Sequence, residues 1–354
     1  MTVPRHDFRR VVFGEGSIGR LALDVGEAGY SRVFVVTTRG RAEMVEKIAA
    51  SLGKSLADTF SDAVEHTLVE TTDRAETELE RVGADSIVAI GGGSAIGLGK
   101  ALVLRTGLPL VAVPTTYSGS EMTSIYGETD ATGKKTGKDA RVAPKLIIYD
   151  PNLTLDLPID VSAASGVNAL AHSVESLYAP NATTTSDERA EQSIRLLASS
   201  LPRIVASPSN SAARNDALQG AQLAGEVLGA TAMGLHHSIC HVLGGSFRMP
   251  HAKTHAVILR YVVAYNFDSA RQAMTRFARA MGCRNAIAGI EDLCMKLPIP
   301  RNLAEIGLRE DQLDAAAAEI AAGSYPNPRP VTATSVAALL HAAWQGSSPL
   351  GVRQ

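Results

Sequence analysis

Residues 86–100 read SIVAIGGGSAIGLGK, and this stretch decides the fold. Ser86–Ile90 is a continuous apolar run, which predicts a strand buried on both faces of a parallel sheet. Three glycines follow, and they let the backbone approach a ligand closely. The helix expected after them would present free N–H groups and its positive dipole end to a diphosphate. The alternative is a tight turn that binds nothing.

Three more apolar runs alternate with helical stretches: Val33–Thr37, Leu110–Val113 and Leu146–Tyr149. This alternation predicts a Rossmann-like α/β domain. After about residue 158, alanine- and leucine-rich helical patterns dominate. A chain of 354 residues also favours two domains at roughly 100–200 residues each. We expect an α/β dinucleotide-binding domain over 1–158 and an all-helical substrate or catalytic domain over 159–354.

Composition narrows the class of protein further. The formal net charge is −2, so nucleic acid is not expected as a partner. The sequence contains no run of about 18 apolar residues, so we expect no membrane span. The first residues lack the apolar region of a secretory signal. Three cysteines without paired spacing favour a reducing compartment. We therefore expect a cytoplasmic protein.

A second polar loop strengthens the nucleotide interpretation. Residues 114–120 read PTTYSGS and follow the run Leu110–Val113. Two adjacent strand ends with such loops form a crevice in which open α/β sheets bind ligands. The alternative is a capping segment, which also favours Ser and Thr. At the end of the first apolar run, Thr37 and Arg39 stand where a carboxylate would select NAD, so we expect both NADH and NADPH to be used.

Histidines cluster in the second half of the chain. Asn168 and His172 are spaced i, i+4, as are His237 and His241, and five histidines fall within residues 236–255. Such spacing places each pair on one helix face. One carboxylate and three imidazoles would form a divalent metal site, but here an amide stands at Asn168. A single histidine on an apolar helix is usually a core residue, whereas this density indicates a functional site.

These segments together resemble the iron-containing alcohol dehydrogenase superfamily, whose fold dehydroquinate synthase shares. The stretches at 234–245, 250–255 (PHAKTH) and 325–330 (YPNPRP) resemble the maleylacetate reductase branch. In the metal-dependent relatives the position of His255 is typically asparagine. The resemblance covers nearly the whole chain. It implies NAD(P)H-dependent reduction of maleylacetate, a small dicarboxylate from aromatic compound degradation, to 3-oxoadipate, and it implies a homodimer.

The resemblance also implies residue roles. The cofactor is expected at Thr37, Gly92, Gly93, Ser94, Thr115, Thr116, Ser120 and Lys135. Lys134 or Lys138 could take the role of Lys135. Four histidines are expected to act on the substrate: His172, His237, His241 and His251. Imidazoles at three of these positions would hold the ketone oxygen or a carboxylate, and His241 would deliver a proton or position the nicotinamide.

Two substrate carboxylates need cations, and a further donor could orient the substrate. The candidates for substrate binding are Lys253, His255, Tyr325 and Arg329. A structural role for Arg329 is equally compatible with the sequence. Lys253 could instead be solvated, and Tyr325 could pack in the wall of the site.

The amide at Asn168 replaces an aspartate of the metal-binding relatives. An amide is a weaker ligand and does not offset the charge of a dication, so we expect no tightly bound metal. If a metal is held, its ligands would be Asn168, His172, His237 and His251. The alternatives are a metal-dependent (Fe or Zn) alcohol dehydrogenase or aldehyde reductase of the same fold, a lyase similar to dehydroquinate synthase, and a non-catalytic nucleotide-binding protein.

The opening residues Phe8–Phe13 read as a strand. An isolated strand needs a partner, which we expect across a dimer.

Overall fold

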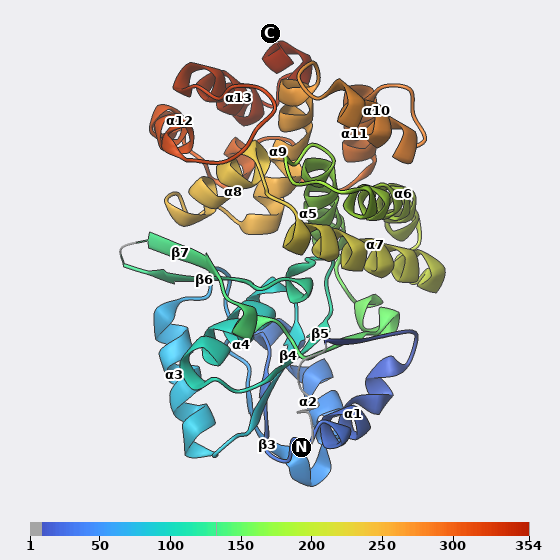
Figure 1. Ribbon diagram of the computed structural model, residues 1–354, viewed down its shortest axis with the longest axis vertical. Coiled ribbons are helices and arrows are strands. Elements are labelled where there is room, and N and C mark those ends of the chain that lie inside the picture. Colours follow the sequence, from blue (N-terminus) through green and yellow to red (C-terminus); the bar gives the residue numbers. More distant parts are fainter. Residues whose placement is uncertain (1–8, 132, 354) are drawn as a thin grey trace. The chain divides into compact units, whose positions relative to one another are not determined.

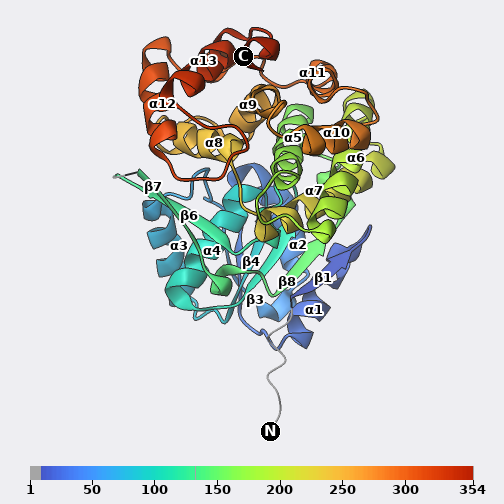
Figure 2. The ribbon, with the colours of Figure 1, turned by 45° about the horizontal axis from the view of Figure 1, so that its top comes forward.

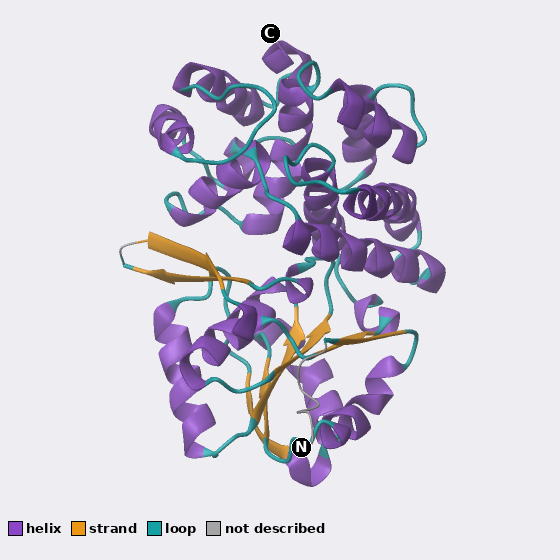
Figure 3. Ribbon diagram, viewed as in Figure 1, coloured by secondary structure: helices purple, strands orange, loops and turns teal. Residues whose placement is uncertain are grey.

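The computed structural model describes residues 9–131 and 133–353 (Figure 1). The chain divides into two compact units, Met1–Leu155 and Asp156–Gln354, which are described separately below. Figure 3 shows that the strands belong to the first unit, whereas the described part of the second unit consists of helices and loops. The predicted fold class, a Rossmann-like α/β region followed by an all-helical region, is confirmed.

A six-stranded sheet forms the centre of the first unit, with the strand order β1-β8-β5-β4-β2-β3. All of its pairings are parallel. The strands are β1 (Arg10–Phe13), β2 (Val33–Val36), β3 (Leu56–Phe60), β4 (Ser86–Gly91), β5 (Leu110–Pro114) and β8 (Leu146–Tyr149). The strands β2, β4, β5 and β8 are buried at every residue, as their continuous apolar runs predict.

Helices cover both faces of this sheet. They are α1 (Leu21–Glu27), α2 (Ala42–Ala50), α3 (Val69–Arg81) and α4 (Gly93–Thr106). Alternate residues of β2 point to opposite faces: Phe34 joins the core with α3 and α4, whereas Val35 joins the core with α1 and α2. A separate antiparallel hairpin, β6 (Ile125–Asp130) and β7 (Gly133–Lys138), stands apart from the sheet.

The N-terminal strand corrects one expectation. Phe8 lies outside the described residues, but Arg10–Phe13 pairs in parallel with β8 of the same chain (Figure 2). Its Val12, for example, lies opposite Ile148. The strand therefore needs no second chain to satisfy this pairing. The sequence alone could not show the pairing, because more than 130 residues separate the two strands.

The second unit is built from α5 (Ile159–Ser176), α6 (Thr184–Ala206), α7 (Ser211–Ala230), α8 (Leu235–Gly245), α9 (His251–Asn266), α10 (Arg271–Ala280), α11 (Ala286–Lys296), α12 (Leu313–Ala322) and α13 (Ala333–Gln345). Helix α5 is buried along almost its whole length. An apolar cluster joins α8, α9, α12 and α13. In the described residues, no helix combines the length and apolar character needed to cross a membrane.

Arg214 fixes the beginning of α5, although its side chain is fully buried. Its guanidinium donates to the carbonyl of Pro208 at 2.9 Å, to the hydroxyl of Ser162 at 2.7 Å and to the carbonyl of Leu157 at 3.1 Å. Helix α7 thereby holds the first turn of α5 in place.

We predict that Arg214→Leu lowers the free energy of unfolding by about 3 kcal/mol, because buried acceptors would lose their charged donor. Urea unfolding measures the change. Arg195→Leu, an exposed position on α6, is the control and should change stability by less than about 0.5 kcal/mol. Equal effects of the two substitutions would contradict the role of Arg214.

Candidate functional site

Six histidines gather inside the second unit. They are His172 on α5, His236, His237 and His241 on α8, and His251 and His255 on α9. Neighbouring ring centroids are 4.4 Å apart for His251 and His255 and 4.9 Å for His172 and His237. The structure thus brings together all four histidines that the sequence proposed as catalytic, with two more between them.

A buried carboxylate, Glu175, organises one side of this cluster. Its Oε2 accepts from the backbone N–H of Gly234 at 3.0 Å, and its Oε1 accepts from the N–H of His236 at 2.8 Å. The Nδ1 of His237 lies 2.6 Å from Oε2. Burial alone would raise the pKa of Glu175, but the hydrogen bond and charge of His237 outweigh burial and lower that pKa to about 2. Glu175 is therefore an anion at neutral pH.

The Glu175 carboxylate holds a proton on Nδ1 of His237 and extends the network. An ionised carboxylate can only accept, so Nδ1 of His237 carries a proton. Nε2 of His237 then faces Nδ1 of His172 at 2.8 Å. One proton lies between these two nitrogens. Glu175, His237 and His172 form a continuous hydrogen-bonded line, which we call the Glu175 line.

Sequence reasoning missed Glu175, although a signal was present. Asn168, His172 and Glu175 are spaced i, i+4, i+7, which places all three on one face of α5. A carboxylate in such an apolar helix is costly unless it is paired. The spacing to His172 could therefore have marked Glu175 as a partner of the imidazoles.

A second imidazole pair lies beside the Glu175 line. Nε2 of His236 is 2.9 Å from Nδ1 of His255, and both side chains are fully buried. Burial, with the neighbouring His237, lowers the pKa of His236 to about 3. Burial and the surrounding histidines lower the pKa of His255 well below its usual value. Both rings are neutral, so the structure does not support His255 as a cation for a substrate carboxylate.

The four positions that the resemblance assigns to a metal do not fit one. Nε2 of His237 is engaged by His172. Asn168 offers a buried amide oxygen that has no hydrogen-bond partner within residues 9–131 and 133–353, and such an oxygen is a weak ligand for a dication. These side chains form no group of three clustered His, Cys, Asp or Glu ligand atoms in the described part of the chain.

Another trio, His236, Cys240 and His255, does bring three such atoms within 4.8 Å. Burial, however, raises the pKa of the Cys240 thiol well above its usual value. Without a metal the thiol therefore stays protonated, and it would have to lose this proton to act as a ligand. The hydrogen bond between the two imidazoles accounts for the close approach of the trio.

The proposed substrate-binding residues lie in different settings. Lys253 is exposed in the first turn of α9. The hydroxyl of Tyr325 donates to the carbonyl of Ile320 at 3.0 Å. Arg329 donates to the carbonyls of Val352 and Arg353 at 3.1 and 3.2 Å, and its guanidinium lies 4.2 Å from the centre of the Tyr265 ring. Of the two roles that the sequence left open for Arg329, these contacts support the structural one.

Gly234 permits the close contacts of Glu175. A Cβ there would lie 2.7 Å from the carbonyl oxygen of Pro326 and 3.1 Å from Oε1 of Glu175. The segment of Pro326 is itself anchored, because Asn266 and Asn327 exchange amide hydrogen bonds of 2.9 and 2.8 Å. A side chain at 234 would push α8 away from the carboxylate that its backbone binds.

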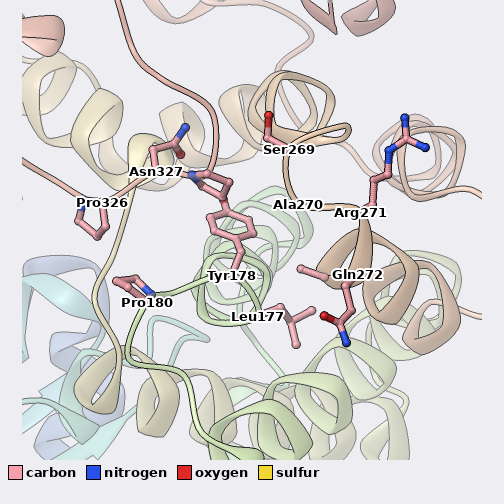
Figure 4. Close-up of a pocket in the computed structure, with 11 residues that line it drawn as sticks. Leu177, Tyr178, Pro180, Ser269, Ala270, Arg271, Gln272, Pro326 and Asn327 are labelled. Carbon is pink, nitrogen blue, oxygen red and sulfur yellow. The ribbon is translucent and has the colours of Figure 1, made fainter.

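A pocket of about 410 Å³ lies near Tyr178 and Asn327. Figure 4 shows the Tyr178 ring between Leu177 and Asn327, with the side chain of Arg271 directed away from it. None of the six clustered histidines lines this pocket. The Tyr178 hydroxyl is 3.4 Å from Oε1 of Glu175, so Tyr178 connects the pocket to the Glu175 line.

In the first unit, the glycine-rich turn has the form expected of a diphosphate site. Helix α4 begins at Gly93, and the space that a Cβ would occupy there is open. A Cβ at Gly92 would lie 2.8 Å from the Thr116 side chain, so the two predicted loops touch. The hydroxyls of Thr37 and Thr115 are fully buried and have no hydrogen-bond partner among the residues that the structure describes. Such unpaired hydroxyls fit a polar ligand at this edge of the sheet.

Two other predicted cofactor residues lie further along the same unit. The Ser120 carbonyl accepts a 2.7 Å hydrogen bond from the buried Lys100, which holds this loop. Lys135 lies on β7, where it pairs with Asp130 at 2.6 Å and remains 73% exposed. The hairpin, not the six-stranded sheet, therefore carries Lys135.

Comparison with known proteins places the chain in a family. Residues 9–151 match the iron-containing alcohol dehydrogenase model, and residues 162–344 match the C-terminal model of the Fe-containing alcohol dehydrogenase family. The chain is 46% identical to a maleylacetate reductase of Burkholderia cepacia over 96% of this chain and 97% of that protein.

Two solved structures are similar throughout. The maleylacetate reductase from Rhizobium sp. strain MTP-10005 has a TM-score of 0.91 at 42% identity, and that from Agrobacterium tumefaciens has 0.91 at 40%. Each comparison covers 99% of both chains. The resemblance predicted from the motifs is confirmed: the chain belongs to the iron-containing alcohol dehydrogenase family and, within it, to the maleylacetate reductases.

Proposed function

We propose that this oxidoreductase reduces the conjugated carbon–carbon double bond of maleylacetate to give 3-oxoadipate, with NADH or NADPH as the reductant and without a catalytic metal. The identity to maleylacetate reductases over nearly the whole chain supports the substrate. The observation that carries the chemistry is the Glu175 line, because it offers an imidazole donor where a metal does not fit. The homodimer expected from the resemblance remains part of the proposal.

The first unit supplies the residues that would hold the cofactor. The N–H groups of Gly93 and Ser94 in the first turn of α4 would bind the diphosphate. Thr115 and Thr116 would donate to polar groups of the nicotinamide half. When bound, the dinucleotide supplies a hydride to the β-carbon of the enone. The buried unpaired hydroxyl of Thr115 supports this placement.

Negative charge then develops on the ketone oxygen of the substrate, because the electrons of the double bond move into an enolate. Preorganised donors stabilise such charge most effectively where water is excluded. In this proposal His172 donates to the oxygen from its Nε2, so its Nδ1 accepts the proton on Nε2 of His237, and Glu175 balances the charge of the doubly protonated His237. His237 is thus a positioning residue, since its two nitrogens contact Glu175 and His172.

Two other histidines complete the proposed reaction. His251 begins α9, with its ring centroid 4.4 Å from that of His255, and in this proposal it holds a substrate carboxylate. His241 stands one turn after His237 on α8, with ring centroids 6.1 Å apart. It would deliver the proton that completes the saturated product. Lys253, exposed beside His251, would supply a cation for the second carboxylate.

The test of the proposal is a direct assay. We predict that the protein, after dialysis against EDTA, oxidises NADH in the presence of freshly made maleylacetate, with a rate that added Fe²⁺ or Zn²⁺ does not raise more than about twofold. Absorbance of NADH measures turnover, and elemental analysis measures bound metal. Faster turnover of simple alcohols, or turnover that requires stoichiometric metal, would instead favour a metal-dependent alcohol dehydrogenase of the same fold.

We predict that Glu175→Gln lowers kcat by about 10²-fold, because an amide keeps the shape of the carboxylate but not its charge, and general acid catalysis typically contributes ~10²–10⁴-fold. KM should change little. The matched control is Glu291→Gln, which removes a carboxylate paired with Arg260 in the same unit. If both variants retain wild-type kcat, the Glu175 line has no catalytic role.

The lowered pKa of Glu175 also predicts how protein stability depends on pH. The pKa of Glu175 is lowered from its ordinary value of 4.5 to about 2, so its ionised form stabilises the fold above pH 4.5. This contribution is lost as the pH falls through 2. The stability difference between wild type and Glu175→Gln should therefore be constant near neutral pH and shrink below about 4.5. Acid-dependent urea unfolding measures it, and a difference that grows in acid would contradict the assignment.

A further inference from the structure

Two arginines share one carboxylate at an edge of the sheet in the first unit. Nε of Arg39 is 2.6 Å from Oδ1 of Asp62, and Arg74 donates to Oδ2 of the same side chain. Arg39 lies directly after β2, Asp62 lies directly after β3, and Arg74 belongs to α3. We call these three residues the Asp62 cluster.

The strand register places this cluster beside the glycine-rich turn. Val36 of β2 lies opposite Ala89 of β4 on one side and opposite Phe60 of β3 on the other. The three parallel strands therefore end at the same edge. The segments after β2 and β3 stay side by side beyond the strands. The N–H of Thr37 donates to the Phe60 carbonyl at 2.9 Å, and the N–H of Ala63 donates to the Thr37 carbonyl at 3.1 Å.

Rossmann-like sheets bind the adenosine ribose at the end of the strand next to the glycine-rich one. In this chain that strand is β2, and its end carries Arg39. A 2′-phosphate on the ribose is the only difference between NADPH and NADH. The side chains around position 39, which would face the ribose 2′-position, therefore determine which of the two cofactors binds better.

The charges of the cluster act in opposite directions on a 2′-phosphate. The Arg39 and Arg74 side chains are 82% and 58% exposed, so much of each remains accessible. Guanidinium groups bind phosphate with paired donors. Asp62 uses both of its oxygens on these same donors, and its negative charge repels a phosphate. The ribose of NADH has a neutral 2′-hydroxyl, which Asp62 does not repel and which does not compete with Asp62 for the two guanidinium groups.

We propose that Asp62 is the specificity-determining residue for the cofactor: by occupying Arg39 and Arg74, it holds back a 2′-phosphate, so the protein uses NADH more readily than NADPH while accepting both. This inference rests on the proposed function, since it requires a dinucleotide at this edge. It assigns the choice of cofactor to an ion cluster that joins the ends of two strands, rather than to a single residue after β2.

Binding of nucleotide fragments tests the proposal without turnover. Isothermal titration of AMP and of 2′-phosphoadenosine 5′-phosphate, at low ionic strength, gives the ratio of the two Kd values. We predict that Asp62→Asn tightens the phosphorylated fragment by about tenfold and changes AMP by less than about twofold. The kcat/KM ratio for NADPH over NADH should rise by a similar factor.

The matched control is Asp58→Asn. Asp58 lies on the same strand β3 and pairs with Arg81 at 2.7 Å, but it precedes the carboxyl end of the strand. Its removal changes the net charge equally and should leave the Kd ratio unchanged. Arg39→Ala is a second variant and should weaken the phosphorylated fragment by about tenfold with AMP unaffected.

Three results would overturn the proposal. The Kd ratio could stay the same in both Asp62→Asn and Arg39→Ala, or Asp58→Asn could shift it as much as Asp62→Asn does. In either case normal AMP binding would show that the cofactor site itself stands and that this inference alone fails. Absence of AMP binding to the wild type would overturn the proposed cofactor site and this inference together.

Discussion

The hydrogen bonds of one buried carboxylate, Glu175, hold the histidine cluster together. A charge without access to water is stable only when strong donors surround it. Glu175 obtains two backbone N–H groups from the beginning of α8 and the Nδ1–H of His237. Three constraints follow from this one requirement. Helix α8 must start close to α5, residue 234 must be glycine, and the His237 ring can adopt one orientation.

Most of the fold could be predicted from the sequence, because its strands and helices have distinct local patterns. The apolar runs Val33–Thr37 and Leu146–Tyr149 became β2 and β8, within one residue of the predicted ends. The alanine- and leucine-rich patterns after about residue 158 became the helices of the second unit, among them α13. The partner of β1 could not be predicted, since parallel pairing between distant segments leaves no local signal.

The candidate site could be predicted less completely. Helical spacing correctly placed pairs of histidines on shared faces, but it does not specify which nitrogen faces which neighbour. The hydrogen bond between His172 and His237, and the neutrality of His255, arise from packing among three helices. Arg329 illustrates the same limit: a guanidinium suits a substrate carboxylate and backbone carbonyls equally well, and only the fold supplies the carbonyls.

The amide at Asn168 has a consequence for electroneutrality. It lies two turns before Glu175 on the same face of α5, in a region closed to water. An aspartate there would give this helix face a second anion, which a bound cation or a protonated imidazole would have to balance. Asparagine leaves Glu175 as the one carboxylate of the two positions, and the donors around Glu175 satisfy its charge. The identity of residue 168 thus sets how much positive charge this helix face has to hold.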